Sequence, residues 1–293
     1  MKNLSTVFLV VALVGLTSVA NGQRRSRLNV EDKETLTQTL QFSAGNGAKV
    51  LEVDSINGRI RATAYDGRNV EMTAYKTIRA ESQSTLQLAR QEVRLDIADN
   101  ADTINIFVNQ PGHERSTGPS SSRFNNSNWR DRGYEVSFDF DIRVPRQAGV
   151  RLWTINGGPI EVVELAGDFQ VNNINGAIEM RNISGSGRAH TINGAVTVTF
   201  ANNPQRDSHF GSLNGAIDVT LPRDLSADLR FKTFNGGVYT DFSITAVPIA
   251  ATTERISGRL TNRNEFSVVR VGRGGPTLEF DGFNGDVRIR QAK

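Results

Sequence analysis

The chain contains no cysteine. Without a thiol it can form no disulfide, bind no metal through thiolate ligands and carry no lipid on a cysteine side chain. Its stability must therefore come from side-chain packing and from backbone hydrogen bonds.

Histidine is almost as scarce, with only His113, His190 and His209 among 293 residues. The sequence also has no HExxH motif, no nucleophile elbow and no phosphate-binding loop. These shortages argue against a zinc site and against a histidine-based catalytic triad.

An excess of one charge is missing as well. The 34 basic and 31 acidic residues leave a formal charge of +3. Proteins that bind nucleic acid depend on many contacts with phosphates, so this near balance argues against a nucleic-acid partner. The length is ample for a large all-β core.

The sequence has only one long hydrophobic run, at its N-terminus. Lys2 precedes an apolar stretch from Val7 to Val19, and Ala20-Asn21-Gly22 then places small residues before a cleavage point at Gln23. This is the pattern of a secretory signal peptide, and the run is shorter than the ~20 residues that span a bilayer. We expect residues 1–22 to be removed, leaving a periplasmic, cell-surface or extracellular protein with no transmembrane anchor.

A short motif repeats along the rest of the chain. Successive asparagines from Asn156 to Asn235 are 19, 18, 21 and 21 residues apart, and Asn284 follows later. A degenerate copy, Arg255-Ile256-Ser257-Gly258, lies in the gap before the last motif. The full copies are Ser55-Ile56-Asn57-Gly58, Thr154-Ile155-Asn156-Gly157, Asn173-Ile174-Asn175-Gly176, Thr191-Ile192-Asn193-Gly194, Ser212-Leu213-Asn214-Gly215, Thr233-Phe234-Asn235-Gly236 and Gly282-Phe283-Asn284-Gly285.

Two folds can explain the Asn-Gly pairs. A two-residue hairpin would put Ile174 on one face with Glu179 and leave both faces mixed. Uninterrupted alternation places Ile174, Gly176, Ile178 and Met180 on one side instead. This phase favours a strand that bends at the glycine and continues over a hairpin meander.

Continuing strands at a period of about 20 residues predict an all-β, single-chain β-solenoid, similar to a parallel β-helix. Equivalent residues of stacked coils would form files at strand spacing, about 4.8 Å. One file would be apolar: Ile155, Ile174, Ile192, Leu213, Phe234 and Ile256. A second would be a ladder of side-chain amides: Asn57, Asn156, Asn175, Asn193, Asn214, Asn235 and Asn284.

The remaining segments divide the chain further. We expect a flexible tail at 23–34, an N-terminal β region at 35–109, a disordered loop at 110–132 and the repeat region at 133–293, continuing the same domain. Ser84-Thr85-Leu86-Gln87 has capping-box spacing, which indicates a short helix from Thr85 to about Val93; a continuing strand is the alternative.

Two surfaces are candidates for binding. The loop at 110–132 carries Arg123 and Trp129, whose charge and ring suit an anionic glycan or a nucleic acid, although a solvated loop explains the same composition. An outward file one residue past the first apolar position after each Asn-Gly would hold Glu161, Glu179, Thr197, Asp218 and Tyr239. Its carboxylates could bind calcium or share a proton, as polysaccharide cleavage requires. Thr197 interrupts the file, however, and solvated polar positions explain it equally well.

The repeated Ile-Asn-Gly-x-Ile-x-Val pattern, the Val144-Pro145-Arg146 turn and the signal peptide resemble the bacterial putative-adhesin β-solenoid family. The resemblance covers roughly Leu36 to Arg290. It implies a regular or flattened β-helix in the cell envelope or outside the cell, and it supplies no catalytic residues.

We therefore expect a non-enzymatic exported protein that contacts an envelope glycan or another envelope protein, with no cofactor and no catalytic or metal-binding residue. The alternative is a polysaccharide-cleaving β-helix enzyme that uses the carboxylate file, with calcium as its cofactor. A third hypothesis is a purely structural module. The sequence does not indicate the oligomeric state.

Overall fold

The computed structural model describes residues 28–43, 45, 47–100, 102–114, 123–124, 132–247, 253–256, 259–262 and 266–293. The predicted signal peptide and most of the predicted loop at 110–132 lie outside these residues. The chain divides into two compact units, the first ending at Gly158 and the second beginning at Pro159. The protein is all-β, with a single α-helix in the described part.

In its described residues the first unit contains ten strands and the helix. They are β1 (Val30–Leu40), β2 (Val50–Asp54), β3 (Ile60–Tyr65), β4 (Val70–Ala80), α1 (Gln83–Glu92), β5 (Arg94–Asp99), β6 (Thr103–Asn109), β7 (His113–Glu114), β8 (Arg123–Phe124), β9 (Tyr134–Pro145) and β10 (Gly149–Asn156).

These strands form two mixed sheets, ordered β1-β4-β9-β3 and β10-β2-β6-β5, and β7 pairs with β8 separately. Strands β2, β3 and β10 have parallel neighbours, whereas β1–β4, β4–β9 and β5–β6 are antiparallel. The prediction of a parallel arrangement from Leu36 onward is therefore wrong for the outer strands of this unit. For β5 and β6 the reason is the connection, because the three residues 100–102 between them are too few for the crossover that parallel pairing needs.

The sequence indicates a short helix here, but α1 begins two residues before the predicted start, and its cap is Ser82 and not the predicted Ser84. Ser82 caps it, because the Ser82 hydroxyl accepts a hydrogen bond from the Thr85 backbone N–H at 3.2 Å. Leu86 and Ala89 are its buried residues. The backbone is extended from Val93, where the predicted alternation begins and β5 follows.

The predicted tail at 23–34 is wrong for its last residues, because β1 begins at Val30 and pairs with β4 over its whole length. Cross-strand and neighbouring charges explain why so polar a segment forms a strand. Glu31 lies 2.9 Å from Arg79, and Asp32 lies 2.8 Å from Arg90 of α1. Opposite charges on facing strands favour the pairing.

The second unit contains fifteen strands in the described residues. They are β11 (Ile160–Val163), β12 (Phe169–Asn175), β13 (Ile178–Ile183), β14 (Gly187–Asn193), β15 (Val196–Phe200), β16 (Ser208–Asn214), β17 (Ile217–Leu221), β18 (Ala227–Lys232), β19 (Val238–Thr240), β20 (Ile244–Ala246), β21 (Thr253–Ile256), β22 (Arg259–Asn262), β23 (Ser267–Val271), β24 (Thr277–Asn284) and β25 (Val287–Gln291).

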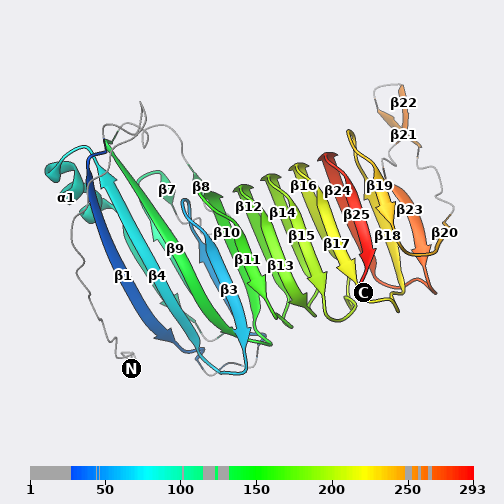
Figure 1. Ribbon diagram of the computed structural model, residues 1–293, viewed down its shortest axis with the longest axis horizontal. Helices are drawn as coiled ribbons and strands as arrows, with labels where there is room; N and C mark the ends of the chain where they lie inside the picture. The colour runs from blue at the N-terminus through cyan, green and yellow to red at the C-terminus, as the bar shows by residue number, and fades with distance from the viewer. Residues whose placement is uncertain are drawn as a thin grey trace. The chain divides into compact units, whose positions relative to one another are not determined.

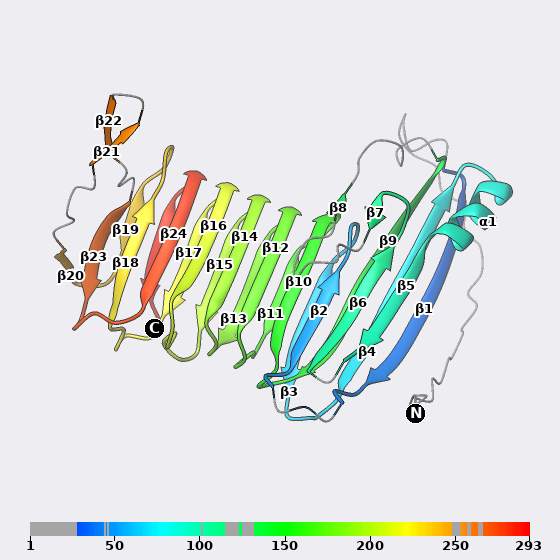
Figure 2. The ribbon, with the colours of Figure 1, turned by 180° about the vertical axis from the view of Figure 1, so that it is seen from behind.

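From β11 to β20, consecutive strands of the second unit alternate between two sheets (Figures 1 and 2). Sheet A has the order β11-β13-β15-β17-β25-β19, and sheet B has the order β12-β14-β16-β24-β18-β23-β20. The strands on either side of an Asn-Gly pair, such as β12 and β13, lie in different sheets and pair in parallel with the next copy of themselves. The hairpin alternative is therefore wrong.

The last coil of the chain does not lie at the end of the stack. Strand β24 pairs in parallel with both β16 and β18, and β25 pairs with both β17 and β19. The C-terminal coil thus separates two coils that are neighbours in sequence. The degenerate motif forms no coil, because β21 and β22 around it pair antiparallel, with Ile256 opposite Arg259. Ser257 itself lies outside the described residues.

The core of the second unit lies between sheets A and B. Phe200 of β15 and Phe210 of β16 meet across the two sheets with ring centroids 6.0 Å apart. Ile178 and Met180 are fully buried, but Ile174 is only partly buried and Asn173 is 2% exposed. The predicted phase is wrong, because the corner between Asn175 and Ile178 shifts the alternation by one residue.

In the second unit the residue before each motif isoleucine points inward, and its side chain forms hydrogen bonds with backbone carbonyls at the turn between the two sheets. The Thr191 hydroxyl donates to the Gly176 carbonyl and the Ser212 hydroxyl to the Gly194 carbonyl, both at 2.8 Å. These carbonyls lie where the chain leaves one sheet for the other. A small hydroxyl side chain at this position therefore supplies the hydrogen bonds that these buried carbonyl groups need.

Candidate binding face

The predicted carboxylate file lies on sheet A. Register pairs Glu161 with Glu179, Glu179 with Thr197, and Thr197 with Asp218. Arg288 follows Asp218 and lies between it and Tyr239. The structure therefore places the file residues side by side, with Thr197 and Arg288 interrupting them.

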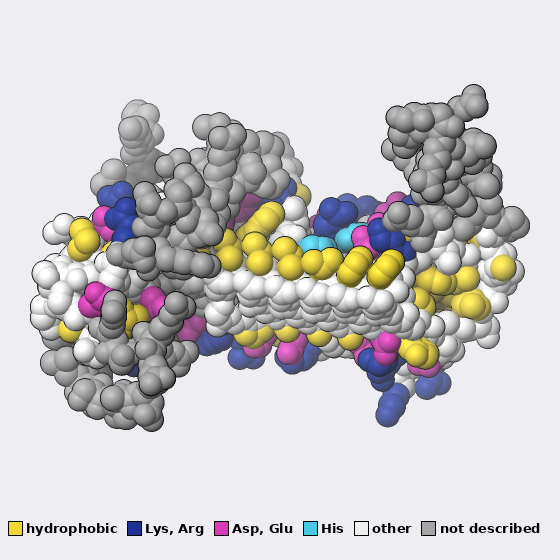
Figure 3. All heavy atoms as spheres, turned by 90° about the horizontal axis from the view of Figure 1, so that it is seen from above, with side chains coloured by type: hydrophobic (Ala, Val, Ile, Leu, Met, Phe, Trp, Pro, Cys, Tyr) yellow, Lys and Arg dark blue, Asp and Glu magenta, His cyan; other side chains and the backbone are white. Residues whose placement is uncertain are grey.

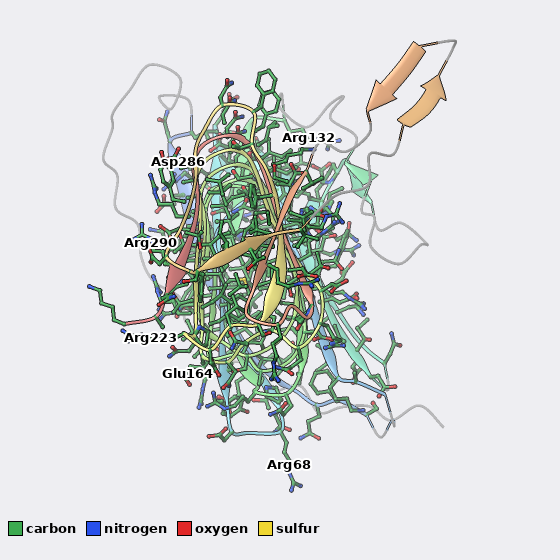
Figure 4. All side chains as sticks on the ribbon, turned by 90° about the vertical axis from the view of Figure 1, so that its right-hand side faces the viewer. Arg68, Arg132, Glu164, Arg223, Asp286 and Arg290 are labelled. Carbon is green, nitrogen blue, oxygen red and sulfur yellow. The ribbon has the colours of Figure 1, made fainter. Side chains whose placement is uncertain are left out.

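Arginines are the partners of this file. Glu179 is bonded to Arg181, and Asp218 lies 2.9 Å from Arg290. Figure 4 shows Arg290 and Asp286 on one side of the fold, and Asp286 is 2.5 Å from Arg288. Each of these carboxylates is thus paired with a guanidinium of sheet A.

The motif asparagines of the second unit form a continuous chain of amide hydrogen bonds. Each Nδ2 donates to the next Oδ1, at 2.7 Å from Asn193 to Asn175 and at 2.9 Å from Asn214 to Asn193. Asn284 donates to Asn214 at 2.7 Å, and Asn235 donates to Asn284 at 2.8 Å. The inserted C-terminal coil thus keeps the ladder intact.

In the first unit Asn57 behaves differently. Its Nδ2 donates to the Val136 carbonyl at 3.0 Å, although its backbone forms a parallel bridge with that of Asn156. Asn57 therefore ties the motif to β9 through its side chain.

The motif isoleucines and their equivalents form an exposed apolar ridge beside the ladder. The ridge consists of Ile174, Ile192, Leu213, Phe283 and Phe234, in the order of the strands. Leu213 and Phe283 are each 43% exposed and Phe234 is 74% exposed. The rings of Phe234 and Phe283 are stacked, 5.0 Å apart and 6° from parallel. Figure 3 shows a row of hydrophobic side chains beside the histidines.

Two polar rows run parallel to the ridge on the same face of sheet B. The nearer row contains Asn172, His190, Gly211, Asp281 and Lys232, and the farther row contains Gln170, Arg188, His209, Glu279 and Arg230. Together the ridge and these two rows are called the sheet B face below. It combines apolar, cationic and anionic side chains in a regular array.

His190 and His209 converge over Gly211. A Cβ atom at Gly211 would lie 2.7 Å from Cδ2 of His190 and 3.0 Å from Nε2 of His209. The missing side chain therefore makes room for both rings. His209 Nδ1 is also 3.0 Å from the Glu279 carboxylate.

Burial lowers the pKa of both histidines. For His190 the charges of His209 and Arg188 add to the effect of burial, and for His209 the charge of Arg188 does so. Glu279 and Asp281 act in the opposite direction on His209 without reversing the shift. At neutral pH both rings are therefore uncharged.

Part of this face is hollowed. A hollow of about 540 Å³ is lined by Phe169, Gln170, Gly187, Arg188, Asp207, Ser208, His209, Arg230, Thr277 and Glu279. Its size is within the range of small-ligand sites. A second hollow, of about 440 Å³, lies in the first unit between β1, β3, β4 and β9.

The signal for the polar rows was present in the sequence. Arg188, His209 and Glu279 each lie five residues before a motif asparagine, and His190 lies three before. Because these offsets differ, counting from the asparagines alone predicts that His190 and His209 do not stack. They are not in register, but neighbouring rows on neighbouring strands bring them together diagonally.

The other predicted surface lies mostly beyond the described part of the chain. The backbone of Arg123 belongs to β8, opposite Glu114, and Trp129 is outside the described residues.

In the described ranges no group of three or more histidine, aspartate or glutamate side chains could hold a metal ion. No helix there is long and apolar enough to cross a bilayer.

Comparisons with known proteins give similarity only to solved structures. No family model and no curated protein matches the chain. A putative cell adhesion protein from Clostridium sporogenes has a TM-score of 0.41 at 10% identity, over 88% of this chain and 100% of that one. A putative adhesin from Bacteroides fragilis has a TM-score of 0.36 at 12% identity, over 88% and 97%. A putative lipid binding protein from Parabacteroides distasonis has a TM-score of 0.25 at 10% identity, over 88% and 97%. At this similarity the function has to be sought in the chain's own residues.

The histidine pair predicts a pH dependence of stability. As the pH falls, the unfolded chain binds protons near pH 6.5, before the folded chain does, so each histidine lowers stability in acid. We expect His190→Gln/His209→Gln to lose less of its thermal midpoint than the native chain between about pH 7.5 and about pH 5. Scanning calorimetry at both pH values measures this difference. Equal losses for the two proteins would contradict it.

Proposed function

We propose that this chain is an exported, non-enzymatic β-solenoid that binds a glycan of the cell envelope through its sheet B face. The solenoid assignment is supported by strands that alternate between two sheets and stack in parallel register, coil upon coil. The predicted signal peptide at 1–22 supports export. The periplasm, the cell surface and the exterior are all compatible with it.

The exposed apolar ridge carries the proposal. Solvent-exposed apolar side chains are common singly, whereas a contiguous row with a polar rim is typical of an interaction site. Here the ridge is flanked by the asparagine ladder on one side and by charged rows on the other. Sugar rings present an apolar face and a rim of hydroxyls, so a glycan matches both parts. An envelope protein is the other partner to be tested.

The file on sheet A supports binding more than catalysis. Glu179 and Asp218 are each paired with an arginine of the same sheet, whereas polysaccharide cleavage needs two carboxyl groups that both face one glycosidic bond. We therefore propose no catalytic or metal-binding residue, and no cofactor. The file with Tyr239 remains a second candidate binding surface.

Replacing one residue on each face separates the two surfaces. Phe283→Ser removes an exposed ring from the ridge, and we expect it to weaken glycan binding roughly tenfold, since burying a phenylalanine contributes about 1.5–3 kcal/mol. Tyr239→Ser removes a ring that is 57% exposed on sheet A, and we expect affinity to stay within about twofold. Titration calorimetry of residues 23–293 with a panel of envelope polysaccharides gives both values.

The same samples test the alternatives. A loss of affinity in Tyr239→Ser but not in Phe283→Ser would show that the glycan binds to sheet A. New reducing ends, or unsaturated ends that need calcium, would show an enzyme. If the native chain binds no polysaccharide but binds an envelope protein, the glycan proposal fails.

A further inference from the structure

Arg188 is the one cation of the two polar rows whose charge has no counterpart. Arg230 lies 3.5 Å from Glu279, and Lys232 lies 3.5 Å from Asp281. Arg188 is exposed, and its side chain forms no hydrogen bond or ion pair with any part of the chain that the structure describes. Both carboxylates of the rows are thus already matched, and the guanidinium of Arg188 is left for a partner outside the chain.

The neighbours of Arg188 show that its charge acts locally. It lowers the pKa of His190 and of His209. Its register neighbours are Gln170 and His209, and all three side chains line the hollow of about 540 Å³. An anionic group that enters the hollow would therefore find its cationic partner at Arg188, because Arg230, the other cation of the lining, already lies beside Glu279.

The rest of the lining suits hydroxyl groups. The amide of Gln170 has no hydrogen-bond partner among the described residues. The Asp207 carboxylate also faces the hollow, and one of its oxygens accepts the Thr277 backbone N–H at 2.7 Å. A carboxylate repels a ligand that is anionic all round, such as a sulfated chain, but it accepts hydrogen bonds from hydroxyls.

We infer that this hollow binds an acidic sugar of a polysaccharide, with the sugar carboxylate on Arg188 and its hydroxyls on Gln170 and Asp207. The inference rests on the proposed glycan-binding function and names its ligand class. A planar carboxylate can accept two parallel hydrogen bonds from a guanidinium. The ridge lies on the same strands as the hollow, so a polymer can occupy both.

The experiment uses two polymers with the same backbone. Polygalacturonate carries one carboxylate on each sugar, and its methyl ester has the same rings without the charge. We expect residues 23–293 to bind the acid at least about tenfold more tightly than the ester in calorimetry. Alginate and hyaluronate serve as further carboxylated polymers, and dextran sulfate as a general polyanion.

Arg188→Met should lower the affinity for polygalacturonate by about tenfold or more and leave binding of the ester unchanged. Arg181→Met is the matched control, because it removes the same charge from sheet A, and we expect its affinity to change less than about twofold. An unchanged thermal midpoint of Arg188→Met shows that the fold is retained.

Four results would overturn the acidic-sugar site: none of the three carboxylated polymers is bound, the ester is bound as well as the acid, Arg188→Met behaves like Arg181→Met, or dextran sulfate binds as tightly as polygalacturonate. Binding of neutral polysaccharide that depends on Phe283 would refute this site while preserving the proposed function. Absence of binding to every polysaccharide would refute both.

Discussion

Phe280→Ala is expected to lower the free energy of unfolding by about 3–5 kcal/mol, because it leaves a cavity in the centre of the core. Phe280 is fully buried in β24, and its ring stacks on Phe210 with centroids 5.6 Å apart. Phe210 in turn lies 6.4 Å from Phe169. The variant therefore interrupts a file of rings that connects the inserted C-terminal coil with the coils before it.

Phe283→Ala is the matched control, since it removes the same side chain from the same strand. Phe283 points outward into the ridge, and we expect its loss to cost less than about 1 kcal/mol. Scanning calorimetry should show the transition of the second unit shifted by roughly 10 °C in Phe280→Ala and by only a few degrees in the control. Similar shifts for the two variants would contradict the burial pattern.

The spacing of the motifs in the sequence predicts which residues of sheet B are neighbours on adjacent strands. Counting back from each motif asparagine places Gln170, Arg188 and His209 at one offset, and they are neighbours in the structure. This works because parallel in-register strands preserve sequence offsets. The sheet B face could therefore have been found by aligning the coils on their asparagines.

Two features could not be found in that way. The order of the coils is invisible to an alignment, because Asn284 fits beside Asn214 as well as Asn235 does. Which pair of strands lies next to β16 and β17 depends on how well each complete pair packs there, and not on its motif asparagine alone. The second feature is which side chains point into the core. Inward and outward side chains alternate along a strand, but this alternation does not continue through the turn between two sheets.

Ile174 shows why the predicted side-chain orientation is wrong. An isoleucine in an alternating pattern is normally assigned to the core, and here the inward position is taken by Asn173, whose Nδ2 donates to the Ala177 carbonyl at 3.3 Å. The corner requires buried donors for its carbonyls, so polar residues point in and the isoleucines point out. The same requirement creates the ridge on which the proposed function depends.

Gly194→Ala is expected to destabilise the second unit by at least about 1–3 kcal/mol, because the coils are closest at their glycine corners. A Cβ atom at Gly194 would lie 2.3 Å from the Gly176 carbonyl oxygen and 2.5 Å from its carbon. Both contacts are with backbone, which can move only if the coils separate. Gly215 repeats the contact one coil further on, with its Cβ 2.0 Å from the Gly194 carbonyl oxygen.

Gly282→Ala is the opposite case and the matched control. Gly282 occupies the inward position that Ser212 fills in the neighbouring coil, and a Cβ there would find its nearest atom, Thr233 Oγ1, at 3.4 Å. Alanine fits this space and restricts the unfolded chain, so we expect a gain of up to about 0.4–1 kcal/mol. The thermal midpoints should therefore move in opposite directions from the native value. Two glycines that respond alike would mean that close backbone approach at the corners does not hold these coils in register.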